Sequence, residues 1–138
     1  MNLVKTKKIL SLLVLSVLMA IVCVGCAPKT VEEAYEKADK MVAKWSDSSE
    51  YLCSYYSDFL EEKGVPIYLV KAQSLSVEDE TDSFKCYNAL TVSNFVYEEL
   101  SPIFENFSEV VVSIAILDEN NETYYLTSNG EVIFNLYE

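Results

Sequence analysis

The sequence contains no histidine and no arginine, and only three glycines and three prolines in 138 residues. Without histidine there is no imidazole to act as a general base, to bind a metal or to change charge near neutral pH. Without arginine there is no guanidinium group to bind a phosphate or a carboxylate in bidentate fashion. Ser–His–Asp and Cys–His catalytic sets are therefore excluded, and we expect no catalytic residues and no enzyme activity.

The one long apolar run lies at the N-terminus. Lys5, Lys7 and Lys8 precede residues 9–24, in which only two serines interrupt the apolar side chains. A spanning helix needs about 20 apolar residues, so this shorter run fits the core of a signal peptide with its lysines on the cytoplasmic side. Two alternatives are an uncut signal anchor and ordinary cleavage after a small-x-small motif.

The apolar run ends in Val22-Cys23-Val24-Gly25-Cys26, which resembles the export signal of bacterial lipoproteins. The resemblance covers residues 1–26: Gly25 matches the small residue before the cysteine, whereas Cys23 stands where an aliphatic residue is usual. It implies that residues 1–25 are a cleaved signal peptide, that Cys26 carries a covalent lipid and that residues 26–30 are a short tether. The resemblance also implies a location at the bacterial cell membrane, on the extracytoplasmic side.

The remaining residues, 31–138, are expected to form a single acidic domain. Beyond residue 25, seven lysines face all 22 acidic residues, which gives a net charge of −15. Such a charge repels nucleic-acid phosphates and anionic lipid headgroups. We therefore expect no nucleic-acid partner, membrane contact through the lipid anchor, and electrostatic attraction of a protein or cationic peptide.

Two helices are expected at the start of this domain. Thr30 and Glu33 form a capping box, and an apolar stripe of helical spacing predicts a helix over residues 31–45. A second capping box, Asp47 with Glu50, precedes apolar residues that predict a helix over residues 51–60. Lys63-Gly64-Val65-Pro66 then combines signals that end a helix.

Strands and one further helix are expected in the rest of the chain. Residues 67–75 and 84–92 are predicted to form a β-hairpin across an acidic connection, followed by a third helix over residues 93–107 that Pro102 kinks or divides. Residues 110–117, 123–127 and 131–137 predict an antiparallel meander, with Asn129-Gly130 as its last turn. The predicted fold class is α+β, with helices packed on a mainly antiparallel sheet.

The candidate binding residues are four tyrosines in two adjacent pairs, Tyr55/Tyr56 and Tyr124/Tyr125. Neighbouring residues on a helix or a strand point in different directions, so at least one tyrosine of each pair is expected on the surface. Such rings suit recognition of a peptide, a glycan or a protein. The alternative is that they form the rim of the core.

Two further sets of residues carry expectations with open alternatives. Acidic groups at two predicted hairpin tips supply weak candidate calcium ligands, Asp79, Glu80, Asp82, Asp118 and Glu119. The alternative is solvated turns on an acidic surface, and no other cofactor is expected. Cys53 and Cys86 are either joined by a disulfide, which export permits, or remain two thiols.

The function expected from these observations is a lipid-anchored extracytoplasmic binding protein that recognises a protein or a cationic peptide near the membrane. Only in its general layout, the chain resembles the immunity lipoproteins that intercept cationic bacteriocins at the membrane. One alternative is an accessory subunit of a membrane complex. Another is a cell-wall glycan enzyme that uses paired carboxylates.

Overall fold

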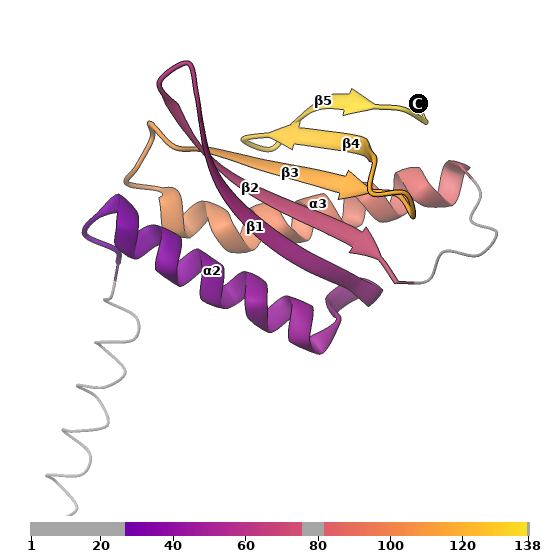
Figure 1. The fold of residues 1–138 in the computed structure, drawn as a ribbon, viewed down its shortest axis with the longest axis horizontal. Coiled ribbons are helices and arrows are strands. Elements are labelled where there is room, and N and C mark those ends of the chain that lie inside the picture. The colour runs from indigo at the N-terminus through magenta and orange to yellow at the C-terminus, as the bar shows by residue number, and fades with distance from the viewer. Residues whose placement is uncertain (1–26, 76–81, 138) are drawn as a thin grey trace, which may run out of the picture.

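The computed structural model describes residues 27–75 and 82–137. Two long helices, α2 (Val31–Ser48) and α3 (Asp82–Phe104), pack against one five-stranded sheet. Its strands, in order across the sheet, are β1 (Cys53–Glu62), β2 (Val65–Ser74), β3 (Val111–Leu117), β4 (Thr123–Ser128) and β5 (Glu131–Asn135) (Figure 1). The predicted α+β class is confirmed, whereas Cys26 and the predicted signal peptide lie outside the described residues.

The first helix forms as the sequence predicts. Thr30 is its N-cap, and the Thr30 hydroxyl oxygen accepts a hydrogen bond of 3.2 Å from the backbone N–H of Glu33. The buried side chains of α2 follow helical spacing and face the sheet: Ala34, Ala38, Val42 and Trp45. Among the described residues, neither helix is long and apolar enough to cross a membrane.

The second predicted helix is wrong, because residues 53–62 form strand β1. The backbone leaves α2 through Ser49, Tyr51 and Leu52, which all have positive φ angles of 51° to 54°. This reversal, which includes the short 3-10 turn Glu50–Leu52, lays the chain along β2. Ten residues then pair in antiparallel register from Cys53–Ser74 to Glu62–Val65, and this pairing outweighs the local helical periodicity.

The predicted helix stop at Lys63-Gly64 is a hairpin turn. Lys63 and Gly64 have φ angles of 53° and 79°, and a two-residue type I′ turn requires positive φ at both positions. The expected strand over residues 67–75 does overlap β2, but its hairpin partner is β1 and not residues 84–92.

Residues 84–92, predicted as a strand, belong to helix α3. Strands β2 and β3 are parallel neighbours, and a parallel pair needs a crossover connection that α3 supplies. Buried residues recur every three or four positions along α3: Ala89, Val92, Val96, Leu100 and Ile103. No second helix begins at Pro102, which lies within α3 two residues before its end.

Strands β3, β4 and β5 form close to the predicted positions and pair in the predicted antiparallel order, but they belong to a five-stranded sheet and not to a three-stranded one. They continue a mixed five-stranded sheet, because β3 runs parallel to β2 while β4 and β5 add in antiparallel fashion. The turn at Asn129-Gly130 has positive φ at both residues, 47° and 83°. It packs closely on α3, since a Cβ on Gly130 would lie 2.9 Å from Cε1 of Tyr97.

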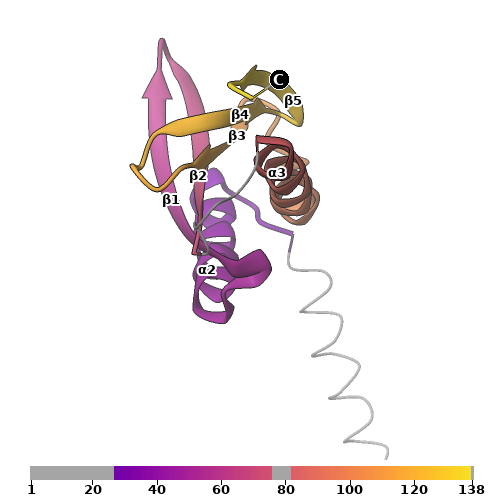
Figure 2. The ribbon, with the colours of Figure 1, turned by 90° about the vertical axis from the view of Figure 1, so that its right-hand side faces the viewer.

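Both helices lie on the same side of the sheet, which curves around them (Figure 2). The core between these two layers contains Tyr55, Val70 and Ile114, all at most 3% exposed. No described helix covers the opposite side, which we call the uncovered face. There Tyr56 and Leu60 of β1 are 56% and 44% exposed.

Candidate functional site

The uncovered face of the sheet holds a cleft of about 540 Å³. We call it the sheet-face cleft. It extends across β1, β2 and β3 to the turn after β3, and its lining residues are Tyr56, Ser57, Asp58, Lys71, Gln73, Leu117, Asn121 and Thr123. The pairing of β1 with β2 brings Tyr56 opposite Lys71.

An aromatic ring and an exposed ion pair dominate the chemistry of the sheet-face cleft. Lys71 Nζ lies 3.3 Å from Asp58 Oδ2, and the two side chains are 40% and 53% exposed. An ion pair so open to water contributes less than about 1 kcal/mol. A cationic ligand can therefore compete with Lys71 for the Asp58 carboxylate beside the exposed ring of Tyr56.

The turn after β3 forms one rim of the sheet-face cleft. Gln73 Nε2 donates a hydrogen bond of 2.7 Å to the carbonyl oxygen of Asp118 and ties this turn to β2. The carboxylate oxygen Oδ1 of Asp118 accepts hydrogen bonds from the backbone N–H groups of Asn120 and Glu122, at 2.8 and 3.0 Å. Asp118 therefore shapes the turn.

Three of the five candidate calcium ligands lie in the described part of the chain. Asp79 and Glu80 lie outside it, Asp82 begins α3, and Asp118 and Glu119 lie in the turn after β3. The parallel strands β2 and β3 both run toward the same end of the sheet. Among residues 27–75 and 82–137, however, no three acidic or cysteine side chains are grouped as metal ligands.

The tyrosine pairs differ from the expectation in one case. Tyr56 is exposed while Tyr55 is buried, its hydroxyl donating a 2.8 Å hydrogen bond to the Glu50 carbonyl, and burial raises the pKa of Tyr55. The expectation is wrong for Tyr124 and Tyr125, which are 4% and 3% exposed. A register shift in the β3–β4 pairing gives β4 an extra residue, and such a bulge breaks the alternation that would expose one ring.

Cys53 and Cys86 are two thiols that are not joined by a disulfide. Cys53 Sγ lies 3.5 Å from the carbonyl oxygen of Tyr51, at the start of β1. Cys86 Sγ lies 3.7 Å from Oδ1 of Asn135, beside the opposite edge strand β5. Of the two alternatives that the sequence left open, the structure has the second.

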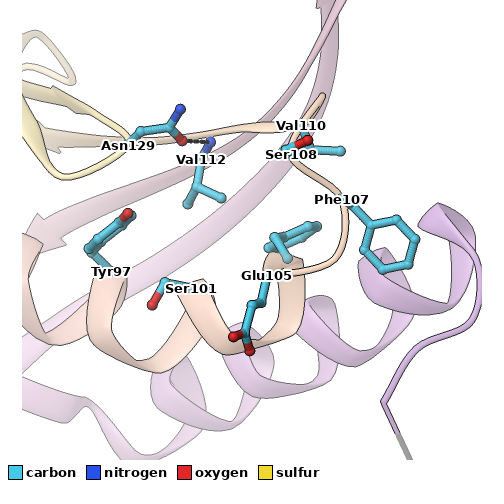
Figure 3. A pocket seen from close by; sticks show the side chains of 9 residues that line it. Tyr97, Ser101, Glu105, Phe107, Ser108, Val110, Val112 and Asn129 are labelled. Atoms are coloured by element: carbon cyan, nitrogen blue, oxygen red, sulfur yellow. Dashed lines mark hydrogen bonds between the residues drawn. The ribbon is translucent and has the colours of Figure 1, made fainter.

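A second cleft, of about 300 Å³, lies between the end of α3 and strand β3, and we call it the α3–β3 cleft (Figure 3). Asn129 Oδ1 accepts a 2.9 Å hydrogen bond from the backbone N–H of Val112 at its upper wall. The side-chain oxygens of Ser101 and Glu105 point away from Asn129, along the outside of α3 (Figure 3). The polar groups lining this cleft do not converge on one point, as a catalytic set would.

A third hollow, of about 290 Å³, lies between the start of α3 and β5, and we call it the α3–β5 groove. Its lining residues are Cys86, Tyr87, Leu90, Tyr125, Val132 and Asn135. Tyr87 is 68% exposed, and Leu90 and Val132 are each nearly half exposed. This groove offers apolar contact with little charge.

A polar cluster around the exposed carboxylate of Asp39 fastens the β1–β2 hairpin to α2. The Asp39 carboxylate oxygen Oδ1 accepts hydrogen bonds from the hydroxyls of Tyr68, at 2.7 Å, and of Ser57, at 2.9 Å. Burial raises the pKa of Tyr68, and the hydrogen bond to Asp39 raises it further. Tyr68 therefore stays a protonated donor at neutral pH and has a structural role.

The sequence pointed to Tyr56 but not to Asp58, Lys71 or Gln73, which line the same cleft. These three were missed because residues 51–60 were assigned to a helix, on which Tyr56 and Asp58 do not share a face. The available signal was the alternation of Tyr56, Asp58 and Leu60 at a period of two.

The chain was compared with protein-family models, with characterised proteins and with solved structures, and none of them matches. The function therefore has to be inferred from the residues of this chain alone.

Proposed function

We propose that this chain is a lipid-anchored, extracytoplasmic binding protein that recognises a basic segment of another protein close to the membrane. The observation that carries the proposal is the sheet-face cleft, where the exposed ring of Tyr56 lies next to the Asp58 carboxylate. It belongs to a chain whose net charge beyond residue 25 is −15.

The contacts on offer match a lysine or arginine side chain. A cation held over a tyrosine ring gains about 0.5–1 kcal/mol at an exposed site, and the Asp58 carboxylate supplies the opposite charge. The overall negative field raises the rate of encounter with a basic partner and makes that rate sensitive to salt. The lipid on Cys26 would hold the domain where such a partner crosses or leaves the membrane.

Salt-dependent binding tests the recognition of basic segments. The full chain, purified in detergent, is titrated with a lysine-rich peptide while the salt concentration is raised through the physiological range. We expect affinity to fall steeply with salt, and Tyr56→Ala and Asp58→Asn to weaken binding. Glu98→Gln removes an equal charge from the exposed side of α3 and is the matched control. Weak binding that ignores salt would overturn the proposal.

The anchor has a separate test in Cys26→Ala. This variant should accumulate as an uncut precursor that keeps residues 1–25 and lacks the mass of the acyl chains. Mass spectrometry measures both properties, and fractionation measures membrane retention. An unchanged mature mass with unchanged membrane retention would contradict lipidation at Cys26.

The α3–β5 groove favours one alternative, an accessory subunit of a membrane complex. Tyr87, Leu90 and Val132 expose apolar surface there, and apolar surface is typical of lasting protein interfaces. A membrane protein that co-purifies in stoichiometric amount from detergent, and is lost in Leu90→Asp, would favour this function over capture of basic segments.

A further inference from the structure

The hydrogen bonds of β1 identify the residues that direct their main-chain N–H and C=O groups to the outer edge of the sheet. The backbone N–H of Tyr55 donates a 3.2 Å hydrogen bond to the Ser46 hydroxyl, outside the sheet. In an antiparallel pair, alternate residues direct their N–H and C=O groups to the same edge. Ser57, Phe59 and Glu61 therefore direct theirs away from β2, as Tyr55 does.

The residue opposite Glu61 independently supports this assignment of the outward-facing residues. Glu61 pairs with Pro66 of β2, and proline has no N–H to donate to a neighbouring strand. A position facing proline suits a pair that exchanges no hydrogen bonds, so Glu61 loses nothing by facing outward. Within residues 27–75 and 82–137, no backbone hydrogen bond beyond the β1–β2 ladder involves Ser57, Phe59 or Glu61.

The outer half of β1, residues 57–62, belongs to a hairpin that extends past the rest of the sheet. The β2–β3 pairing begins at Ile67–Val111, so the hairpin tip has no neighbour in β3. Figure 1 shows this tip projecting beyond the ends of β3 and β4. The side chains of Ser57 and Phe59 contact Asp39 and Tyr35 of α2 on the core side of the sheet, so a second chain would approach β1 from its outer edge and from the tip.

The two edge strands differ in their capacity to accept another strand. β1 pairs with β2 over ten residues without a register shift, which leaves its outer edge regular. β5 has five residues, and a register shift interrupts its pairing with β4. Bulges and short length are features that protect an edge from further pairing, so β5 is protected and β1 is not.

The charge on this edge selects the chemistry of its partner. Asp58, Glu61 and Glu62 are exposed in the outer half of β1, and like charges directly opposite each other destabilise a strand pair. Two copies of β1 therefore repel each other, whereas a basic strand is attracted. Leu60, 44% exposed, offers apolar contact on the uncovered face, and Phe59, 53% exposed with its ring centroid 4.2 Å from that of Tyr35, offers apolar contact on the helix side.

We propose that a basic, extended segment of the partner protein adds to the outer edge of β1 as a sixth strand of the sheet. Main-chain hydrogen bonds to Ser57, Phe59 and Glu61 would supply affinity, and the neighbouring acids would supply the preference for basic residues. The inference rests on the proposed function, because it specifies how the basic segment is held.

Backbone methylation of a probe peptide separates strand addition from simple charge attraction. The probe is a ten-residue peptide that alternates lysine and valine, and its matched control has the same side chains with every internal amide N-methylated. Both are titrated against the full chain in detergent. We expect the methylated peptide to bind at least about tenfold more weakly, because it lacks the donors that a strand needs. Equal binding of both peptides would overturn strand addition and leave the proposed function intact, whereas binding of neither would overturn both.

A matched pair of variants tests the same edge from the side of the protein. Glu61→Pro removes the charge and the outward N–H, while Glu61→Gln removes the charge alone. Proline is tolerated on an edge strand where the N–H faces outward, and circular dichroism checks that the fold is kept. We expect Glu61→Pro to weaken binding of the unmethylated peptide several-fold more than Glu61→Gln. If the Glu61→Pro chain is folded and binds the peptide as tightly as the Glu61→Gln chain, the inference is overturned.

Discussion

Two of the hairpins in the sheet have the same kind of turn in different surroundings. Lys63-Gly64 joins β1 to β2 and Asn129-Gly130 joins β4 to β5, and all four residues have positive φ. A Cβ added at Gly64 would meet nothing within 4 Å, whereas at Gly130 it would lie 2.9 Å from the ring of Tyr97. One turn stands clear of the helices and the other packs on α3.

This difference shows that the turn residues form the hairpin, whereas the neighbouring elements determine how much of its surface stays exposed. The left-handed backbone at Xaa-Gly is enough to fold the chain back in both places. Contacts with α3 then cover the β4–β5 turn, while the β1–β2 hairpin contacts α2 through Tyr55, the Asp39 cluster and Phe59, whose ring centroid lies 4.2 Å from that of Tyr35. The outward main-chain groups of Ser57, Phe59 and Glu61 remain available to a partner, which is why both proposals concern this hairpin.

Replacing the adjacent tyrosines of β1 one at a time gives the largest expected difference in the free energy of unfolding. Tyr55→Ala should lower the free energy of unfolding by about 3–5 kcal/mol, because it removes a buried ring in contact with Trp45. Tyr56→Ala removes a ring from the uncovered face and should cost less than about 1 kcal/mol while weakening binding of a basic peptide. Denaturant unfolding measures both variants. Similar losses of stability would contradict the alternation of buried and exposed side chains along β1.

The sequence was sufficient where local chemistry and tertiary structure agree. The cap at Thr30 and the stripe Ala34, Ala38, Val42 are intrahelical features, so α2 could be predicted from its own residues. Asn129-Gly130 is a strong hairpin signal by itself. Tyr56 could be selected because one member of an adjacent pair usually faces water, although the structure places it on a strand and not on a helix.

The sequence was insufficient where pairing with residues distant in the chain determines the secondary structure. The apolar residues from Tyr51 to Leu60 fit a helix, and only the ten-residue pairing with β2 makes them a strand. Residues 84–92 fit a buried strand or a buried helix, and the parallel arrangement of β2 and β3 requires the helix. The sheet-face cleft needs β1, β2 and β3 in register, so no local pattern could assemble it.

The two turn glycines give an intermediate effect that measures the difference between the hairpins. Gly64→Ala should cost about 1–2 kcal/mol, since a left-handed φ of 79° penalises any Cβ while the space around it is open. Gly130→Ala carries the same penalty and must also displace the ring of Tyr97, which adds about 1–3 kcal/mol. Thermal or denaturant unfolding of the two variants gives the comparison. Equal losses would mean that the β4–β5 turn is not packed on α3.

The hydrogen bond between Tyr68 and Asp39, which fastens the β1–β2 hairpin to α2, gives the smallest expected effect on stability. The pH dependence of unfolding reveals this effect. Because the pKa of Tyr68 is raised in the folded chain above its ordinary value of 10, the protonated phenol favours folding. That contribution is complete below about pH 10, the pKa of an unfolded tyrosine, and is lost as pH rises further. Tyr68→Phe should lower stability by about 1 kcal/mol at neutral pH, through loss of the hydrogen bond to Asp39. It should also reduce the fall in stability above pH 10, without abolishing it, since burial raises the pKa of Tyr55 as well. An alkaline slope identical to that of the original chain would mean that the Tyr68 phenol does not hold the hairpin, and that ring packing against Phe104 and Tyr35 fastens it instead.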